Sequence, residues 1–161
     1  MTVVWSSKHR GAALALASAL LLFGAPAAAA ATPTTDSWTV HVERPFVDCP
    51  DFSVLGVWEI THRLTLFLDS EGIATRDIEK VDFAGRLVNA STAAWVADSG
   101  SRTFFDTLAP DGSFLTTYMV QVRRSAYIHG AGRTDFQSGD SHGRDGMDPA
   151  NVTALCAALG G

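Results

Sequence analysis

The sequence predicts an all-β protein: an antiparallel barrel of about eight strands, or alternatively a β-sandwich, with a short C-terminal helix. Three observations predict this fold. From Trp38 onward apolar and polar residues alternate with the period of two that is typical of strands. Turn-forming segments interrupt this pattern about every 8 to 12 residues, as in antiparallel barrels and sandwiches. A helical start signal occurs only near the end, at Asp148-Pro149.

The first 31 residues have the three parts of a secretory signal peptide. Lys8 and Arg10 supply a basic start, and the apolar run 12–23 is too short to cross a bilayer. Small residues up to Ala31 offer a cleavage site, so we expect cleavage near Ala31 and a secreted, extracellular protein without a membrane anchor. A retained anchor is the alternative. Residues 32–36 are expected to be a flexible tail, and 37–161 a single domain.

Charge narrows the possible partners. Cleavage would remove two basic residues and no acidic one, which leaves 10 basic against 17 acidic residues. Such an acidic chain disfavours nucleic acid and anionic membranes as partners. Nearly all the basic residues are arginine, which together with the alanine-rich leader is typical of bacteria of high GC content.

The mature chain would contain two cysteines, Cys49 and Cys156. In an oxidising compartment an isolated pair most often forms a disulfide. Closing a loop of about a hundred residues would stabilise the fold by about 4 to 5 kcal/mol. Two free or metal-binding thiols are the alternative, although no Cys/His spacing supports a metal.

The first half of the domain divides into three predicted strands and one ambiguous segment. Strand 38–44 is followed by a turn at 48–51, an apolar run over 52–60 and a strand over 64–68, which ends in a hairpin turn at 69–72. Residues 73–83 carry charges on both faces. We expect an edge strand there, with a projecting hairpin or a single helical turn as alternatives.

Turn signals organise the second half. They fall at 89–92, at 98–100 and, most clearly, at 109–112. The strand that begins at Phe114 puts Tyr118 and two valines on one face, and one or two short strands follow over 125–136. A glycine- and aspartate-rich loop over 137–147 then precedes the helix. Asp148 is its predicted N-cap, and a Cys156 disulfide would pin the helix near the first strands.

The loop also contains the only candidate catalytic motif. Gly139–Gly143 fits the hydrolase pattern G-x-S-x-G, with Ser141 as nucleophile and His142 beside it. That motif requires a strand-to-helix turn above a parallel sheet, which this sequence does not predict. We therefore expect a flexible loop and retain Ser141 and His142 only as weak candidates. The loop holds Asp140, His142, Asp145 and Asp148, and such a density of ligands could hold Ca²⁺, but the EF-hand spacing is absent, and we predict no metal or cofactor.

One segment carries a family resemblance. Gly56-Val57-Trp58-Glu59-Ile60 resembles the first-strand signature of lipocalins, and Arg133-Thr134-Asp135-Phe136 is similar to a later T-D-Y turn of that family. The resemblance implies a barrel whose floor is closed by Trp58 against an arginine, for which Arg144 is the nearest candidate, and whose open end admits a small apolar ligand. The alternative is a core tryptophan beside a bulge glycine.

The overall layout also resembles small secreted β-rich proteins of actinobacteria. The leader, the early Phe46–Cys49 segment and the late cysteine carry this resemblance. It supports export and fold, and it implies no activity.

Three functions follow as hypotheses. The first is a secreted, non-catalytic binding or interaction module for an unknown small ligand or protein partner. The second is a lipocalin-like carrier, which needs an enclosed cavity of several hundred Å³, with Trp58, Phe114 and Tyr118 as candidate lining residues. The third is a secreted hydrolase or a barrel-type isomerase or cyclase, which needs a base within hydrogen-bond reach of a nucleophile.

Overall fold

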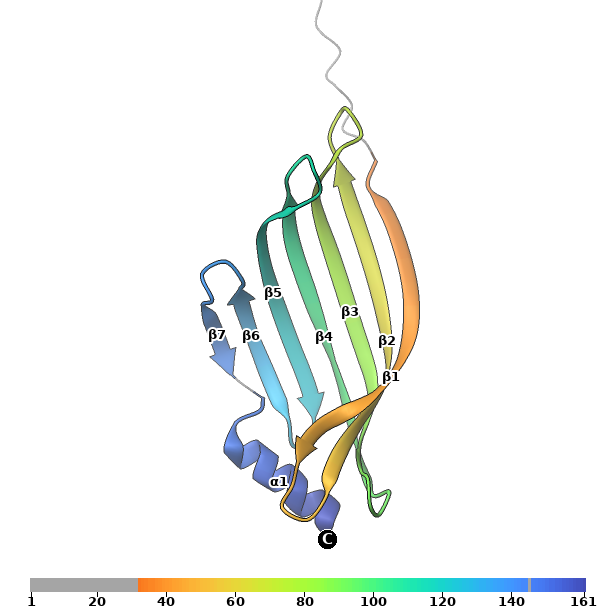
Figure 1. The fold of residues 1–161 in the computed structure, drawn as a ribbon, viewed down its shortest axis with the longest axis vertical. Helices are drawn as coiled ribbons and strands as arrows, with labels where there is room; N and C mark the ends of the chain where they lie inside the picture. Colours follow the sequence, from red (N-terminus) through yellow and green to blue (C-terminus); the bar gives the residue numbers. More distant parts are fainter. Residues whose placement is uncertain (1–31, 145) are drawn as a thin grey trace, which may run out of the picture.

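The protein is a single antiparallel sheet with one helix at its lower end (Figure 1). The computed structural model describes residues 32–144 and 146–161. In the described chain seven strands pair in chain order, each with the next, so the sheet is a simple meander. The elements are β1 (Thr34–Asp48), β2 (Ser53–Leu68), β3 (Ala74–Asn89), β4 (Trp95–Leu108), β5 (Phe114–Ser125), β6 (His129–Asp135), β7 (Ser141–Arg144) and α1 (Pro149–Gly160).

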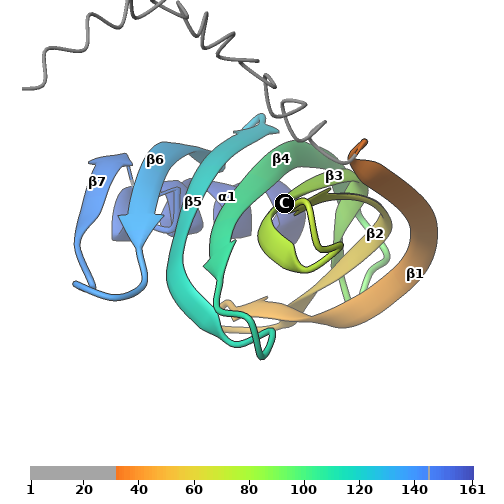
Figure 2. The same cartoon turned by 90° about the horizontal axis from the view of Figure 1, so that it is seen from above.

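The antiparallel all-β class and the C-terminal helix are confirmed, but a closed barrel of about eight strands is wrong. The sheet has seven strands over the described residues, and its two edge strands, β1 and β7, do not pair with each other. β7 has only four residues, too few to continue the ladder along the 15 residues of β1. The sheet nevertheless curls strongly, so that β1 to β5 curve around one interior (Figure 2). An open sheet is compatible with the sandwich alternative.

The strands are longer than the sequence pattern predicts. The segments 52–60 and 64–68 form one strand, β2. Residues 74–83 belong to β3, which pairs on both sides, so the predicted edge strand is in fact central. The predicted turn at 98–100 lies inside β4, and the predicted tail overlaps β1, which begins at Thr34. Cross-strand pairing over 14 to 16 residues outweighs the local turn preference of Asp-Ser-Gly.

Three predicted turns are confirmed. Gly72 and Gly112 have φ of 83° and 82° in the hairpins after β2 and β4, a conformation that favours glycine. The side chain of Asn89 accepts backbone hydrogen bonds from Ser91 and Thr92 in the turn after β3. The predicted loop 137–147 contains the short strand β7.

The helix and the disulfide are confirmed where the sequence predicts them. Asp148 caps α1 by accepting a hydrogen bond from the backbone N–H of Asn151 at 2.9 Å. Cys49 and Cys156 are bonded, with their Cα atoms 5.7 Å apart. This bond holds the helix against the end of β1.

The small hydrophobic core lies at this lower end. Leu155 and Leu159 of α1 are buried against one face of the sheet, which we call the inner face. Asn89 donates a hydrogen bond from Nδ2 to the carbonyl of Leu159 at 3.0 Å. This buried amide therefore helps to hold the end of α1 against the sheet. The buried core residues are Cys49, Val54, Trp58, Leu87, Ile128, Leu155 and Leu159.

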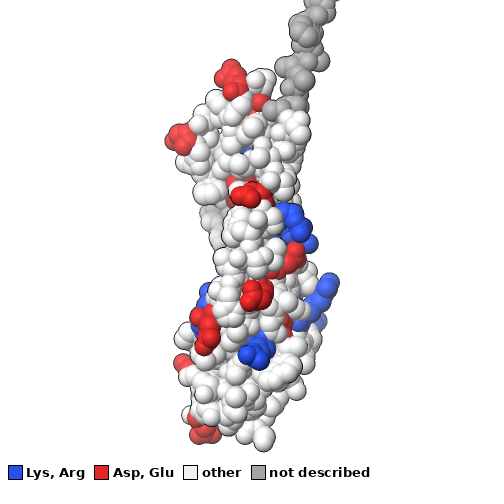
Figure 3. Space-filling model, turned by 90° about the vertical axis from the view of Figure 1, so that its right-hand side faces the viewer, with Lys and Arg blue, Asp and Glu red and all other residues white. Residues whose placement is uncertain are grey.

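The helix, the disulfide and the surface charges bear on where the protein is found and what it meets there. In the described part of the chain, α1 does not have the length and apolar character needed to span a membrane. The predicted signal peptide, residues 1–31, lies outside the described residues. The disulfide is compatible with secretion. Acidic and basic side chains are interspersed on the side of the molecule that Figure 3 shows.

Candidate functional site

Above the core, three arginines and three aromatic side chains gather on the inner face. Strand register places Trp58, Phe83 and Arg102 on this face of β2, β3 and β4, and Arg123 on the same face of β5. The irregular end of β1 contributes the other two members. We call this set, which lines one hollow, the arginine–aromatic groove: Arg44, Phe46, Trp58, Phe83, Arg102 and Arg123.

A buried carboxylate fixes two members of the groove. Asp98 is 1% exposed and accepts a hydrogen bond at Oδ2 from Nε1 of Trp58 at 2.7 Å. Arg123 donates to both oxygens of Asp98, from Nε at 2.9 Å and from a terminal nitrogen at 2.6 Å. Such bidentate, charge-assisted pairs are geometrically specific. They hold Trp58 and Arg123 in one arrangement.

Arg123 also joins the two sides of the curled sheet. Its guanidinium carbon lies 4.5 Å from the ring centre of Phe46 on β1 and 5.7 Å from that of Phe83 on β3. A guanidinium at this distance from an aromatic ring is attracted by the ring quadrupole. The lower end of the sheet is therefore closed by side-chain contacts where β1 and β5 share no backbone ladder.

Arg102 has no such partner. The side chain is half-buried, and within residues 32–144 and 146–161 it forms no hydrogen bond, ion pair or ring contact. Burial lowers the pKa of its guanidinium from the usual value, and the positive charges of Arg123 and Arg44 lower it further. Arg44 is exposed at the rim, with its guanidinium 5.7 Å from the ring centre of Trp58.

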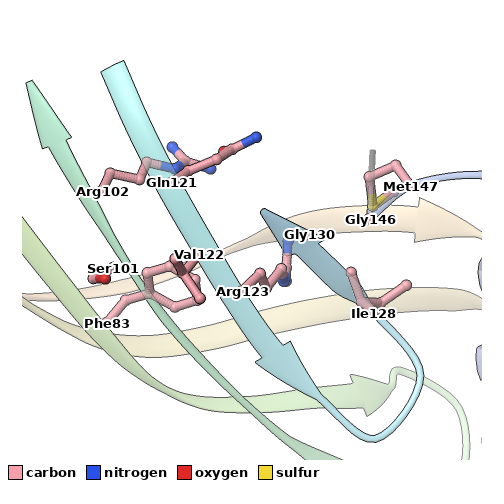
Figure 4. Close-up of a pocket in the computed structure, with 10 residues that line it drawn as sticks. All are labelled: Phe83, Ser101, Arg102, Gln121, Val122, Arg123, Ile128, Gly130, Gly146 and Met147. Carbon is pink, nitrogen blue, oxygen red and sulfur yellow. The ribbon is translucent and has the colours of Figure 1, made fainter. Parts of the chain in front are cut away.

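Two small hollows lie on either side of Arg102 and Arg123. The one toward β1 has a volume of about 70 Å³ and is lined by the groove together with Ile60 and Val81. The other, about 90 Å³, extends toward Gln121, Ile128 and the segment before α1 (Figure 4). Each has room for several water molecules or one carboxylate-sized group. Neither approaches the several hundred Å³ that an enclosed carrier cavity requires.

The open upper end of the inner face carries a second unusual group, a pair of carboxyls. Asp77 and Asp106 are register partners on β3 and β4, each 8% exposed, and one oxygen of each has no hydrogen-bond partner. Burial raises the pKa of Asp77 to about 6, assisted by its hydrogen bond to Asp106 and by the charges of Asp106 and Glu79. A protonated Asp77 can donate its hydrogen bond to Asp106.

The predicted ligand-binding residues do not come together. Trp58 lies in the groove and is 5% exposed. Tyr118 lies on the opposite face of the sheet, where it stacks on Phe105 with ring centres 4.6 Å apart. Phe114 is 64% exposed next to a hairpin tip. The arginine that lies over the Trp58 ring is Arg44 and not Arg144, which lies on β7, the far edge strand.

The G-x-S-x-G segment forms the edge strand β7 and not a strand-to-helix turn. Ser141 pairs with Thr134, and their hydroxyl oxygens are 3.0 Å apart. His142 is exposed and points to the other face by strand alternation, so it is not placed to activate Ser141. No cluster of three or more metal-ligating side chains occurs in the described residues, which leave out Asp145.

Sequence reasoning missed Asp98, Arg102 and Arg123. Asp98 falls in the segment 98–100, which the sequence predicts to be a turn. The available signal was the alternation itself: in a strand that runs through the Asp-Ser-Gly segment, Asp98 and Arg102 share one face. The contact between Asp98 and Arg123, and the closeness of Arg102 to Arg44, could not be predicted because both depend on how the strands pair.

Comparison with known proteins adds no relative to this picture. No family model, curated protein or solved structure matches the chain.

Proposed function

We propose that this protein is a secreted, non-catalytic binding module and that the arginine–aromatic groove is its ligand site. The observation that carries the proposal is Arg102, a half-buried cation without a partner among the described residues, set beside aromatic rings. Ligand sites are typically apolar concavities with a few polar groups left free to orient the ligand. A purely structural arginine would be expected to have a carboxylate, as Arg123 has in Asp98.

The arrangement of the groove supports binding more than catalysis. Asp98 is occupied by Trp58 and Arg123, and the candidate nucleophile Ser141 lies on β7, outside the groove. The small hollows would hold part of a ligand and leave the rest along the open inner face. This differs from a lipocalin-like carrier, which encloses its ligand.

The test uses the neutral fluorescent probe N-phenyl-1-naphthylamine, which reports an apolar site by increased emission. We expect saturable binding of one probe per chain, with energy transfer from tryptophan. Ile60 lines the hollow, so Ile60→Thr should weaken binding at least fivefold. Val120, on the opposite face and 41% exposed, provides the matched control Val120→Thr, which should stay within twofold.

Circular dichroism of both variants would verify that they are folded. Absence of saturable binding, or equal weakening by the two substitutions, would contradict a ligand site in this groove.

A further inference from the structure

The groove carries positive charge that nothing in the described chain balances. Of its three guanidiniums, that of Arg123 is neutralised by Asp98, while those of Arg44 and Arg102 form no ion pair. The whole chain has a formal net charge of −5. The groove therefore has a charge of the opposite sign to that of the protein as a whole. A surface of this kind favours a negatively charged ligand.

Of the three arginines, Arg102 is the one whose positive charge is both desolvated and, among the described residues, unpaired. A guanidinium stays protonated in proteins, so Arg102 cannot relieve its desolvation or the repulsion from Arg44 and Arg123 by losing a proton. An oxyanion bound beside it would offset both effects. The planar fork of an arginine matches a carboxylate in particular.

Beyond Arg102 the inner face carries both apolar and acidic side chains, and the acidic ones are Glu79, Asp77 and Asp106. The next inner-face position of β4 is Phe104, whose neighbours across the ladder are Met119 on β5 and, beyond Glu79, Leu64 on β2. All three apolar side chains are half-buried. Glu79 is bound to Nδ1 of His62 at 2.7 Å. A ligand with its head at Arg102 would therefore have these three apolar side chains within reach of its tail, before it meets Asp77 and Asp106.

We propose that the groove selects an amphiphilic carboxylate, a free acid whose head group binds Arg102 and Arg44 and whose apolar chain lies over Leu64, Phe104 and Met119. This inference rests on the proposed function and names its ligand class. The hollow of about 70 Å³ would accept the head group, and the tail would lie outside it on the inner face.

The experiment compares decanoate, decan-1-ol and acetate as competitors of the neutral naphthylamine probe at low ionic strength. Decanoate should displace the probe at least tenfold more effectively than decan-1-ol, because only the acid has a charged head. Acetate should displace it far less, because it lacks the tail. Raising the salt concentration should reduce the preference for decanoate, since Arg44 is exposed.

Two variants locate the effect. Arg102→Gln should abolish the preference for decanoate over decan-1-ol while probe binding persists. Arg44→Gln, at an exposed site where folding is not at risk, should reduce the preference about threefold. Arg86→Gln, an exposed arginine on the opposite face of β3, is the matched control and should leave the preference unchanged.

The outcomes separate the two proposals. Equal displacement by decanoate and decan-1-ol would overturn the carboxylate inference and leave the groove a binding site. A preference that survives Arg102→Gln would overturn the assignment of the head-group position. Co-sedimentation with phosphatidylglycerol vesicles, without displacement by free decanoate, would show that a lipid surface is bound and would also overturn the inference. No saturable probe binding would remove both proposals.

Discussion

Trp58 and Asp98 are joined across an intervening strand: Nε1 of Trp58 lies 2.7 Å from Oδ2 of Asp98, although β3 runs between β2 and β4. Gly85 is the register partner of both residues, and a Cβ atom added there would lie 2.0 Å from the backbone carbonyl oxygen of Val57, so glycine allows the close approach of β2 and β3. Arg123 completes the unit from β5. One short network thus links β2, β4 and β5 across β3, and two of its members, Trp58 and Arg123, line the proposed ligand site.

Removing the charge of Asp98 should destabilise the fold. Asp98→Asn retains an oxygen for Trp58 but leaves Arg123, whose side chain is only 17% exposed, without its carboxylate. Breaking one side of a buried ion pair typically costs about 3 to 5 kcal/mol. Urea unfolding measures this loss. Asp82→Asn, which removes an exposed partner of Lys80, is the control and should cost less than about 0.5 kcal/mol. An Asp98→Asn protein as stable as the control would contradict a structural role.

The position of the Trp58 ring should depend on Gly56. A Cβ atom added at Gly56 would lie 1.7 Å from the six-membered ring of Trp58, so the ring must move. We expect Gly56→Ala to change near-ultraviolet circular dichroism and tryptophan fluorescence, and to cost about 1 to 3 kcal/mol by overpacking. At Gly161 an added Cβ has only an ordinary contact at 3.5 Å, so Gly161→Ala should leave the spectra unchanged. Unaltered spectra in Gly56→Ala would refute this packing.

Stability should fall as the pH rises toward neutrality. The pKa of Asp77 is raised from 3.8 to about 6 in the folded state, so the native protein binds more protons than the unfolded chain between these values. The stabilisation is fully present below pH 3.8 and is lost as the pH passes through about 6, by up to about 3 kcal/mol. Urea midpoints between pH 4.5 and 7 would measure the slope.

The matched variant is Asp106→Asn. Its side-chain amide can still donate a hydrogen bond to Asp77, but the substitution removes the second carboxyl and its negative charge. The difference between the two proteins isolates the carboxyl pair, because His62 and the other titrating groups are common to both. Parallel pH profiles would show that Asp106 does not raise the pKa of Asp77.

The disulfide should supply a large part of the stability. Cys49 and Cys156 are separated by 107 residues. A loop of that length is worth about 4 to 5 kcal/mol in the chain-entropy account. Replacing both cysteines by serine should lower the urea midpoint accordingly and loosen α1, whose Leu155 and Leu159 complete the core. A loss below about 1 kcal/mol would mean that packing alone holds the helix.

Much of the fold was predictable from local chemistry. Alternation identified strands, Gly72 and Gly112 marked hairpins, and Asp148 with Pro149 marked the helix start. The predictions failed where pairing overrode local preference. Asp98-Ser99-Gly100 is a good turn sequence, yet pairing with β3 and β5 extends it as a strand. The candidate site was less predictable, and of the residues singled out as ligand-binding only Trp58 lies in the groove.

Local features of the chain were enough to predict the antiparallel β class, the terminal helix and the Cys49–Cys156 pairing, because these depend on periodicity, on a capping pattern and on the presence of just two cysteines after the predicted leader. The open sheet, and the groove in which Arg44, Arg102 and Arg123 meet and Arg123 is paired with Asp98, depend on tertiary structure. Strand register and sheet curvature arise from cooperative contacts between residues far apart in the chain, and they fix which alternating side chains share the inner face.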